Sequence, residues 1–203
     1  WFLSTRSGSA QVWVIDPTGG EARQATSLPL EVNVLEVAPQ AGAMILALEV
    51  YPGVTPAATA ERDAAPAAGK GSGRVYDELL FRHWDTWEDG RRSHLFTRPL
   101  DGTDAQLRDL MPDWAADAPT KPFGGGEELA VSADGRALVF TAKVLPGSEG
   151  AWKTDTNLWS VPLDGSAAPH CLTSANLAVD TQPAFSPDGR TVAYLAMARP
   201  GYE

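Results

Sequence analysis

The chain has 203 residues, of which 43% are hydrophobic and 21% are charged, and these proportions are typical of a globular protein with one good core. Its 26 acidic and 16 basic side chains give a net charge of −10, which repels phosphate backbones and argues against nucleic acid as a partner. The single cysteine, Cys171, excludes an internal disulfide, and no run of about 18 apolar residues is present to form a membrane span.

Short runs rich in β-branched and aromatic residues follow one another along the chain and predict strands. They are "AQVWVID" (10–16), "AMILALEV" (43–50), "ELLFRHW" (78–84), "SHLFTRPL" (93–100), "ALVFTAK" (137–143), "NLWSVPL" (157–163) and "TVAYLAM" (191–197). Most of these runs are apolar on both faces, so both faces need a cover. Because few amphipathic helical stretches occur, we expect the cover to be other sheets.

Asp-Gly dipeptides between the runs predict tight hairpin turns, because both residues tolerate positive φ. They stand at 89–90, 101–102, 134–135, 164–165 and 188–189. The sequence therefore predicts an antiparallel protein with hairpin turns at the last three sites in particular.

The runs also repeat. "SADGRALVF" (132–140) matches "SPDGRTVAY" (186–194), while "HLFTRPLDG" (94–102) matches "NLWSVPLDG" (157–165), and "QVWVIDPTG" (11–19) fits the second template. Repeats of roughly 40–60 residues with about four strands each are typical of propeller blades. In such a ring each blade is covered on both faces by its neighbours.

The predicted fold class is therefore all-β: a β-propeller of four-stranded antiparallel blades, present as a partial ring of about three blades within 1–203. Trp13, Phe96 and Trp159 occupy one repeat position, which favours a packing role for all three. The expected blades are 1–26 (partial), 27–110, 111–173 and 174–203 (partial).

An insertion at 52–88 stretches the second of these blades. Its first part, rich in Ala, Pro and Gly, predicts a mobile or partly helical excursion. Within "FRHWDTW", His83 and Asp85 would share one strand face with Phe81 and Trp87. They are either a general-base pair or a polar network that pins the insertion to its blade, and the network is favoured because no nucleophile or metal partner accompanies them.

Glu127 and Glu128 follow three glycines and precede the predicted strand "LAVSADG". Adjacent carboxylates at this place could bind an ammonium group, or they could be a solvated strand start. The nucleophile elbow G-x-S-x-G, H-E-x-x-H and Cys/His zinc spacings are absent from the sequence. The chain alone thus lacks a catalytic triad, and we predict no catalytic residues, metal site or cofactor in it.

"VYDELLFRHWDTWEDGRRSHLF" (75–96), together with "SPDGR", "NLWSVPLDG" and "KPFGGGEELAVSADGR" (121–136), resembles the N-terminal propeller of bacterial serine peptidases of the prolyl oligopeptidase family, of the dipeptidyl-peptidase and acylaminoacyl-peptidase type. The resemblance covers nearly the whole chain. It implies a seven-bladed propeller that caps an α/β-hydrolase domain carrying the Ser, Asp and His. It also implies that Glu127 and Glu128 bind the substrate amino terminus, although their spacing to the next S-x-D-G turn is shorter than in those relatives.

Two functions follow as expectations. The first is a non-catalytic propeller segment of a serine exopeptidase, a hydrolase, that gates access and helps position peptide substrates; the alternative is a Tol-Pal-like propeller acting as a protein–protein interaction module. The expected partners are a C-terminal α/β-hydrolase domain and a peptide substrate, with homo-oligomerisation left open. The sequence indicates a soluble protein of the bacterial cytoplasm or periplasm without deciding between them.

Both ends of the chain fall inside repeats, so we expect terminal blades with exposed apolar faces, or faces covered by another chain. The alternative is a small complete domain in which the terminal strands pair with each other. Burial of the strands around 12–15 and 192–197 distinguishes the two arrangements.

Overall fold

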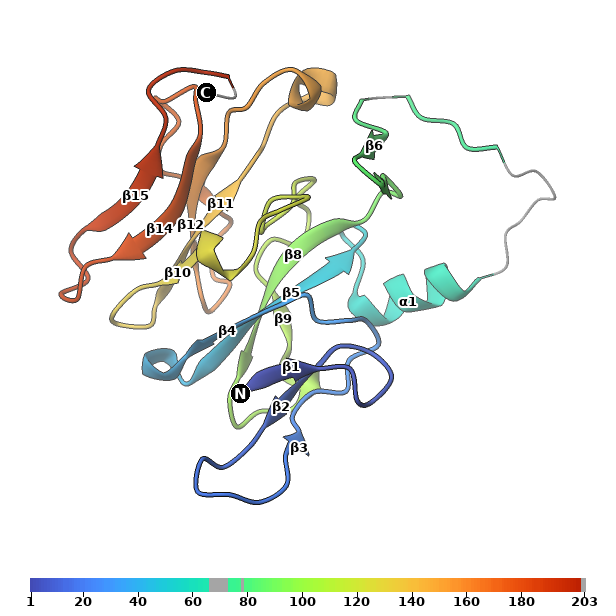
Figure 1. Ribbon diagram of the computed structural model, residues 1–203, viewed down its shortest axis with the longest axis vertical. Coiled ribbons are helices and arrows are strands. Elements are labelled where there is room, and N and C mark those ends of the chain that lie inside the picture. Colours follow the sequence, from blue (N-terminus) through green and yellow to red (C-terminus); the bar gives the residue numbers. More distant parts are fainter. Residues whose placement is uncertain (66–72, 78, 202–203) are drawn as a thin grey trace.

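The computed structural model describes residues 1–65, 73–77 and 79–201, and it is mostly β with antiparallel sheets and one α-helix (Figure 1). The strands are β1 (Phe2–Ser4), β2 (Gln11–Val14), β3 (Arg23–Gln24), β4 (Val34–Ala38), β5 (Ala43–Val50), β6 (Arg82–His83), β7 (Thr86–Trp87), β8 (Arg92–Pro99), β9 (Arg108–Asp109), β10 (Leu129–Val131), β11 (Ala137–Ala142), β12 (Asn157–Pro162), β13 (His170–Cys171), β14 (Asp180–Phe185) and β15 (Val192–Ala196). The helices are α1 (Pro56–Ala64) and the 3-10 turns Pro39–Ala41, Asp104–Gln106, Gly126–Glu128 and Gly147–Ala151.

Two four-stranded antiparallel sheets form the centre of the molecule. The first four-stranded sheet has the order β4-β5-β8-β9, and the second has the order β10-β11-β12-β13. A three-stranded sheet, β1-β2-β3, lies on one side of the first sheet, and the two-stranded sheet β14-β15 lies beside the second (Figure 1). The strands of each sheet lie side by side in the order in which they occur along the chain.

The central strand β5 has apolar side chains on both faces, and both faces are covered by other sheets. Met44, Leu46 and Leu48 belong to a buried cluster shared with the three-stranded sheet. Ile45 and Ala47 belong to a second cluster shared with the second four-stranded sheet. The prediction that two-sided apolar strands are covered by sheet is therefore confirmed for β5.

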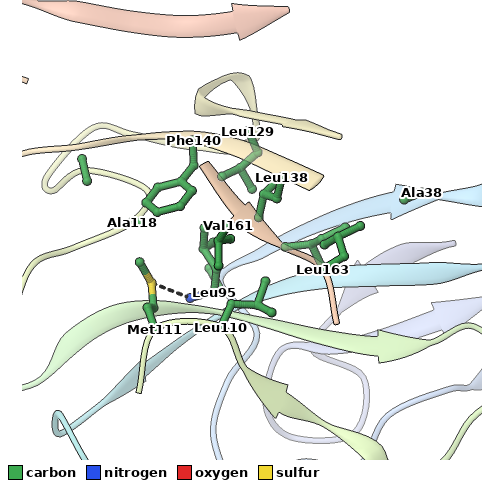
Figure 2. Packing of buried hydrophobic residues seen from close by; sticks show 13 residues of the cluster. Ala38, Leu95, Leu110, Met111, Ala118, Leu129, Leu138, Phe140, Val161 and Leu163 are labelled. Carbon is green, nitrogen blue, oxygen red and sulfur yellow. Dashed lines mark hydrogen bonds between the residues drawn. The ribbon is translucent and has the colours of Figure 1, made fainter. Parts of the chain in front are cut away.

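The cluster between the two four-stranded sheets consists of buried apolar side chains. Phe140, fully buried, lies opposite Leu95 and Met111 of the facing sheet (Figure 2). Its ring meets the edge of Trp114 with centroids 5.4 Å apart. Burial of a large aromatic side chain against a neighbouring sheet is the main force that holds these two sheets together.

The aromatic residues predicted at one repeat position occupy equivalent places in three sheets. Trp13, Phe96 and Trp159 each sit on a strand between two others. Phe96 pairs with Leu46 on one side and Asp109 on the other, and Trp13 and Trp159 pair in the same pattern. Phe96 is buried and the two tryptophans are half-buried. The common register supports their packing role.

The S-x-D-G-R turns have one geometry. In the first, the Ser132 hydroxyl donates to the Asp134 carboxylate (2.6 Å), and the Arg136 N–H donates to the same oxygen (3.1 Å). The Gly135 N–H donates to the Ser132 carbonyl, and Gly135 adopts φ +69°. The turn 186–190 repeats these bonds and this glycine conformation.

These turns correct the predicted role of the aspartates. Asp134 and Asp188 do not take positive φ; only the glycines do. Each aspartate instead accepts hydrogen bonds from its own turn, and the serine hydroxyl bond lowers its pKa most. The hairpin turns at 134–135 and 188–189, and the β12–β13 turn at 164–165, are confirmed. Asp89-Gly90 is not a hairpin turn, because β7 and β8 do not pair.

The turns also stack from sheet to sheet. A Cβ on Gly135 would lie 2.8 Å from the backbone of Ala41, in the turn between β4 and β5. A Cβ on Gly189 would lie 3.2 Å from Ala133 in the preceding turn. The β4–β5 turn "APQAGA" (38–43) is thus a third member of the set, which its sequence did not reveal.

One predicted strand is wrong. "ELLFRHW" does not form a single extended strand in its described residues: β6 and β7 form a tight separate hairpin that turns at Trp84, where φ is +55°. The apolar run therefore belongs to an exposed insertion rather than to a sheet core. Residue 78, and the part of the excursion at 66–72, lie outside the described residues.

The helical expectation for the excursion is confirmed by α1. Thr55 caps the helix by accepting the Ala58 N–H (3.3 Å), and Pro56 occupies the first turn, where its missing N–H costs nothing. Thr59 is buried toward β5, and its hydroxyl accepts the Tyr51 N–H directly after that strand (3.4 Å). None of the helices that the structure describes has the length and apolarity needed to cross a membrane.

The terminal sheets differ in burial. Val12 is fully buried against the first four-stranded sheet, whereas Tyr194 and Leu195 of β15 are 43% and 59% exposed. The strands β1 and β15 lie in separate sheets and are not hydrogen-bonded together. The expected exposure of an apolar terminal face is therefore found on β15 and not on β2.

Candidate functional site

A large cleft lies at the end of the sheets opposite the S-x-D-G-R turns. Its volume is about 1410 Å³. In each four-stranded sheet, one connection joins the second strand to the third. The described residues of these connections, at 51–65, 73–77, 79–91 and 143–156, contribute two walls of the cleft, and the loop 115–124 contributes a third. Because antiparallel strands place successive connections at alternate ends, these segments meet on one face (Figure 1).

The root of the insertion is tied down by a polar network. Asp63 of α1 accepts the Tyr51 hydroxyl (2.9 Å) and pairs with Arg91 (3.1 Å). Arg91 also pairs with Asp89 (2.6 Å), and the Arg62 guanidinium stacks 3.7 Å from the centre of the Tyr51 ring. The pinning network predicted for the insertion exists, but other residues than the predicted ones form it.

A second charge cluster lines the inner wall of the cleft. The Lys121 ammonium pairs with Glu49 (2.6 Å) and Asp117 (3.2 Å). Burial opposes the charged form of Lys121, but the combined attraction of Asp117 and Glu49 outweighs it and raises the pKa of this lysine. Nearby, Arg92 pairs with Glu88. These charges are matched within the protein and hold the loop 115–124 against β5 and β8.

Lys143, directly after β11, lines the same cleft without such a partner. Its ammonium donates to the Gly150 carbonyl (2.7 Å), and no carboxylate of the described residues lies within ion-pair distance. Burial lowers the pKa of Lys143, and the more distant Asp155 only partly offsets this. The cleft wall therefore carries a half-buried cation whose charge is not neutralised.

The hairpin β6–β7 overhangs the cleft and contributes aromatic side chains. Tyr76, Phe81 and Trp87 form a cluster with ring centroids 5.6–6.1 Å apart. At the hairpin tip, Trp84 meets Phe123 of the loop 115–124 edge to face, with centroids at 5.4 Å. Both of these rings stay 73% exposed.

His83 and Asp85 do not form a pair. Both are exposed on the hairpin, on either side of its tip, and no hydrogen bond joins them. His83 lines the cleft, while Asp85 only bonds the neighbouring Thr86. Neither interpretation of the two residues as one functional unit agrees with this geometry.

Glu127 and Glu128 have different environments. Glu128 is buried, and its carboxylate accepts the backbone N–H (2.7 Å) and the hydroxyl (2.8 Å) of Thr120. Burial raises the pKa of Glu128, against the opposing effect of the Thr120 bonds. Glu127 is exposed and its carboxylate lies over Gly125. Neither residue lines the cleft, although Thr120 and Gly124, beside Glu128, do.

The fully buried histidine is a structural element. His94 bonds Asp109 through Nδ1 (2.9 Å) and the Trp114 carbonyl through Nε2 (2.8 Å). It thereby fixes the chain after β9 to the middle of β8. Among the described residues, no cluster of three or more His, Cys, Asp or Glu side chains is arranged to hold a metal ion.

Comparison with known proteins adds a relationship to this geometry. No family model matches the chain. Proteins named dipeptidyl-peptidase 5 match it along its length. The protein from Porphyromonas endodontalis is 29% identical over 203 residues, covering 100% of this chain and 28% of that protein. The one from Trichophyton schoenleinii is 31% identical, covering 97% of this chain and 29% of that protein.

A third protein of the same name also matches the chain. Dipeptidyl-peptidase 5 of Porphyromonas gingivalis is 30% identical over 142 residues, covering 70% of this chain and 21% of that protein. The chain thus spans less than a third of these relatives and is related to peptidases. The bacterial origin stays a prediction. The structure of TolB from Acinetobacter baumannii aligns over 95% of this chain and 33% of that chain, with a TM-score of 0.49 and 13% identity.

Sequence reasoning missed the cationic side of the cleft. Lys121 and Glu49 are 72 positions apart, and only the sheet contact brings them together. Lys143 is the last residue of the predicted strand "ALVFTAK" and reads there as an ordinary surface lysine. No pattern in the sequence marks it, because its significance depends on burial by the 147–151 turn.

Proposed function

We propose that this chain is a non-catalytic β-propeller segment of a longer serine exopeptidase of the prolyl oligopeptidase family, which gates access and positions peptide substrates for an α/β-hydrolase domain. The observation that carries the proposal is the similarity of about 30% to proteins named dipeptidyl-peptidase 5, over as much as the full chain. That the chain spans under a third of those proteins supports a role as one segment of a peptidase.

The sheet arrangement supports the propeller part of the proposal. Each four-stranded sheet consists of consecutive antiparallel strands, and its S-x-D-G-R or equivalent turn stacks on the turn of the next sheet. Propeller blades have this form and this side-by-side packing. In the proposal, the first four-stranded sheet belongs to blade 27–110 and the second to blade 111–173, with partial blades at 1–26 and 174–203.

Glu127 and Glu128 enter the proposal with unequal roles. Glu127 is the ligand for a substrate ammonium group, because its carboxylate is exposed. Glu128 fixes the loop 115–124 beside it through Thr120. In the longer enzyme, Glu127→Gln should raise KM for substrates with free amino termini by about tenfold or more, since a charge-assisted hydrogen bond is lost. Substrates with blocked amino termini should change little, and so should the control Glu31→Gln.

A serine-reactive fluorophosphonate probe tests the assignment itself. We expect it to label the longer protein at the serine of a G-x-S-x-G motif followed by Asp and His, and not to label this 203-residue chain. If the longer protein lacks that motif, or if the probe does not label it, the peptidase assignment is overturned. Isolation of a stable protein partner in that case would favour the alternative, a propeller that acts as an interaction module.

A further inference from the structure

An exposed apolar patch covers the hairpin β6–β7 and the loop that faces it. We call it the hairpin patch, and its members are Leu79, Leu80, Phe81, Trp84, Trp87 and Phe123. Their exposed fractions run from 39% at Leu79 to 73% at Trp84 and Phe123. The rings of Phe81 and Trp87 contact each other, and so do those of Trp84 and Phe123, so these four residues are not isolated on the surface. Exposed apolar side chains gathered on one hairpin and the loop that faces it are the kind of surface that marks a binding site.

The hairpin patch borders the cleft. Leu79 and Leu80 line it directly, and so do Pro122 and Gly124, on either side of Phe123. The cleft volume of about 1410 Å³ exceeds the roughly 300–1,000 Å³ of sites for compact small molecules. Its size suits a peptide segment, and an apolar side chain of that segment could reach the patch that borders the cleft.

The charges on the cleft wall indicate which polar group of such a ligand would bind there. Arg92 and Lys121 are neutralised by carboxylates of the protein, and Arg74 is exposed to water. Lys143 is half-buried and donates only to the Gly150 carbonyl. A half-buried ammonium group keeps two unused N–H donors and an unmatched charge, and a carboxylate satisfies both.

We propose that the cleft binds a peptide that places an apolar side chain on the hairpin patch and a carboxylate on Lys143. The inference rests on the proposed function only in taking a peptide as the ligand. It makes Lys143 and the pair Trp84–Phe123 specificity determinants that neither motif nor repeat position indicated. Peptides that lack either the apolar side chain or the carboxylate bind the cleft more weakly.

Calorimetric titration of the 203-residue chain with three peptides tests this directly. The probes are Ala-Ala-Phe-Ala with a free carboxylate, the same peptide as its carboxy-terminal amide, and Ala-Ala-Ser-Ala with a free carboxylate. We expect the first to bind about tenfold to a hundredfold more tightly than its amide, from the charge-assisted bonds to Lys143. It should bind about tenfold more tightly than the serine peptide, from burial of the ring.

Two variants with matched controls locate the effect. Lys143→Met should remove the preference for acid over amide, whereas Lys153→Met should keep it, because Lys153 pairs with Glu149 outside the cleft. The double variant Trp84→Ala, Phe123→Ala should remove the preference for Phe over Ser. Trp152→Ala is its control, since Trp152 is 75% exposed and does not line the cleft.

Equal affinity of the unaltered chain for the acid and the amide overturns the proposal, and this result does not depend on whether any variant folds. Retention of the acid preference in a folded Lys143→Met variant overturns it as well, and Lys143→Arg should retain the preference if charge is what matters. Selective binding by a chain whose longer protein has no peptidase activity would leave this inference standing and defeat the proposed function alone. Peptidase activity without selective binding would do the reverse.

Discussion

The interface between the two four-stranded sheets and the insertion between β5 and β8 are held in place by different interactions. The interface is a buried apolar cluster in which Phe140 and Leu138 have no exposed surface. The insertion is held at its root by ion pairs around Asp63 and Arg91 and carries aromatic rings into water. The comparison teaches that aromatic residues are buried and stabilise the fold in one region, whereas in the other region they stay exposed.

Two phenylalanines express this difference most strongly. Phe140→Ala should lower the free energy of unfolding by about 3–5 kcal/mol, because it removes a fully buried ring and leaves a cavity. Phe123→Ala should change it by less than about 0.5 kcal/mol, because that ring is already 73% exposed. Chemical denaturation of both variants measures the contrast, and similar losses would contradict it.

The stacked turns give the next effect in size. Gly135→Ala should cost about 2 kcal/mol, since it strains φ +69° and drives a Cβ to 2.8 Å from the Ala41 backbone. Gly189→Ala meets the same strain but only a 3.2 Å contact with the Ala133 side chain, so about 1 kcal/mol is expected. Thermal or denaturant unfolding ranks the two, and an equal cost would show that the contact between turns is unimportant.

The charge cluster of the cleft should matter less. Lys121→Met leaves Glu49 and Asp117 without their shared cation and should cost about 1 kcal/mol. Lys153→Met breaks one exposed pair with Glu149 and should cost about 0.3 kcal/mol. Both differences should shrink in high salt, most for the exposed pair, as unfolding at two ionic strengths can establish.

Glu128 gives the smallest effect, and it depends on pH. Burial raises its pKa in the folded protein, so the folded state holds the proton more tightly than the unfolded chain. Its favourable contribution is complete below the ordinary glutamate pKa and is lost as pH rises through the raised value. Glu128→Gln should therefore gain a little stability relative to the unaltered chain as pH rises from 4 to 7. A pH-independent difference would contradict this.

Most of the long strands that sequence predicts correctly have apolar side chains buried on both faces, although β15, which the sequence also predicts, keeps Tyr194 and Leu195 exposed. β5, β8, β11 and β12 are long and apolar because neighbouring sheets cover them. β9, by contrast, consists of the polar pair Arg108–Asp109 and exists because β8 offers a free edge. Such short strands follow from tertiary pairing and leave no local pattern.

The insertion shows the opposite failure. "ELLFRHW" has the composition of a core strand, yet Phe81 and Trp84 are 41% and 73% exposed. Apolar composition cannot distinguish a core strand from an exposed hairpin, since the difference lies in whether another element covers the strand. Glu127 and Glu128 could be singled out from the sequence because they are adjacent in it. Lys143 could not, because its environment depends on residues that only the fold brings near it.

The central claim is that this chain supports catalysis without performing it. The most direct test compares two purified proteins, the 203-residue chain and the longer protein of which we propose it is a segment. The measurement is hydrolysis of dipeptidyl chromogenic substrates by each. We predict turnover by the longer protein and none by the chain, because the sequence of the chain contains no G-x-S-x-G nucleophile elbow. Turnover by the chain that survives removal of contaminating peptidases, or none by the longer protein, would contradict the account.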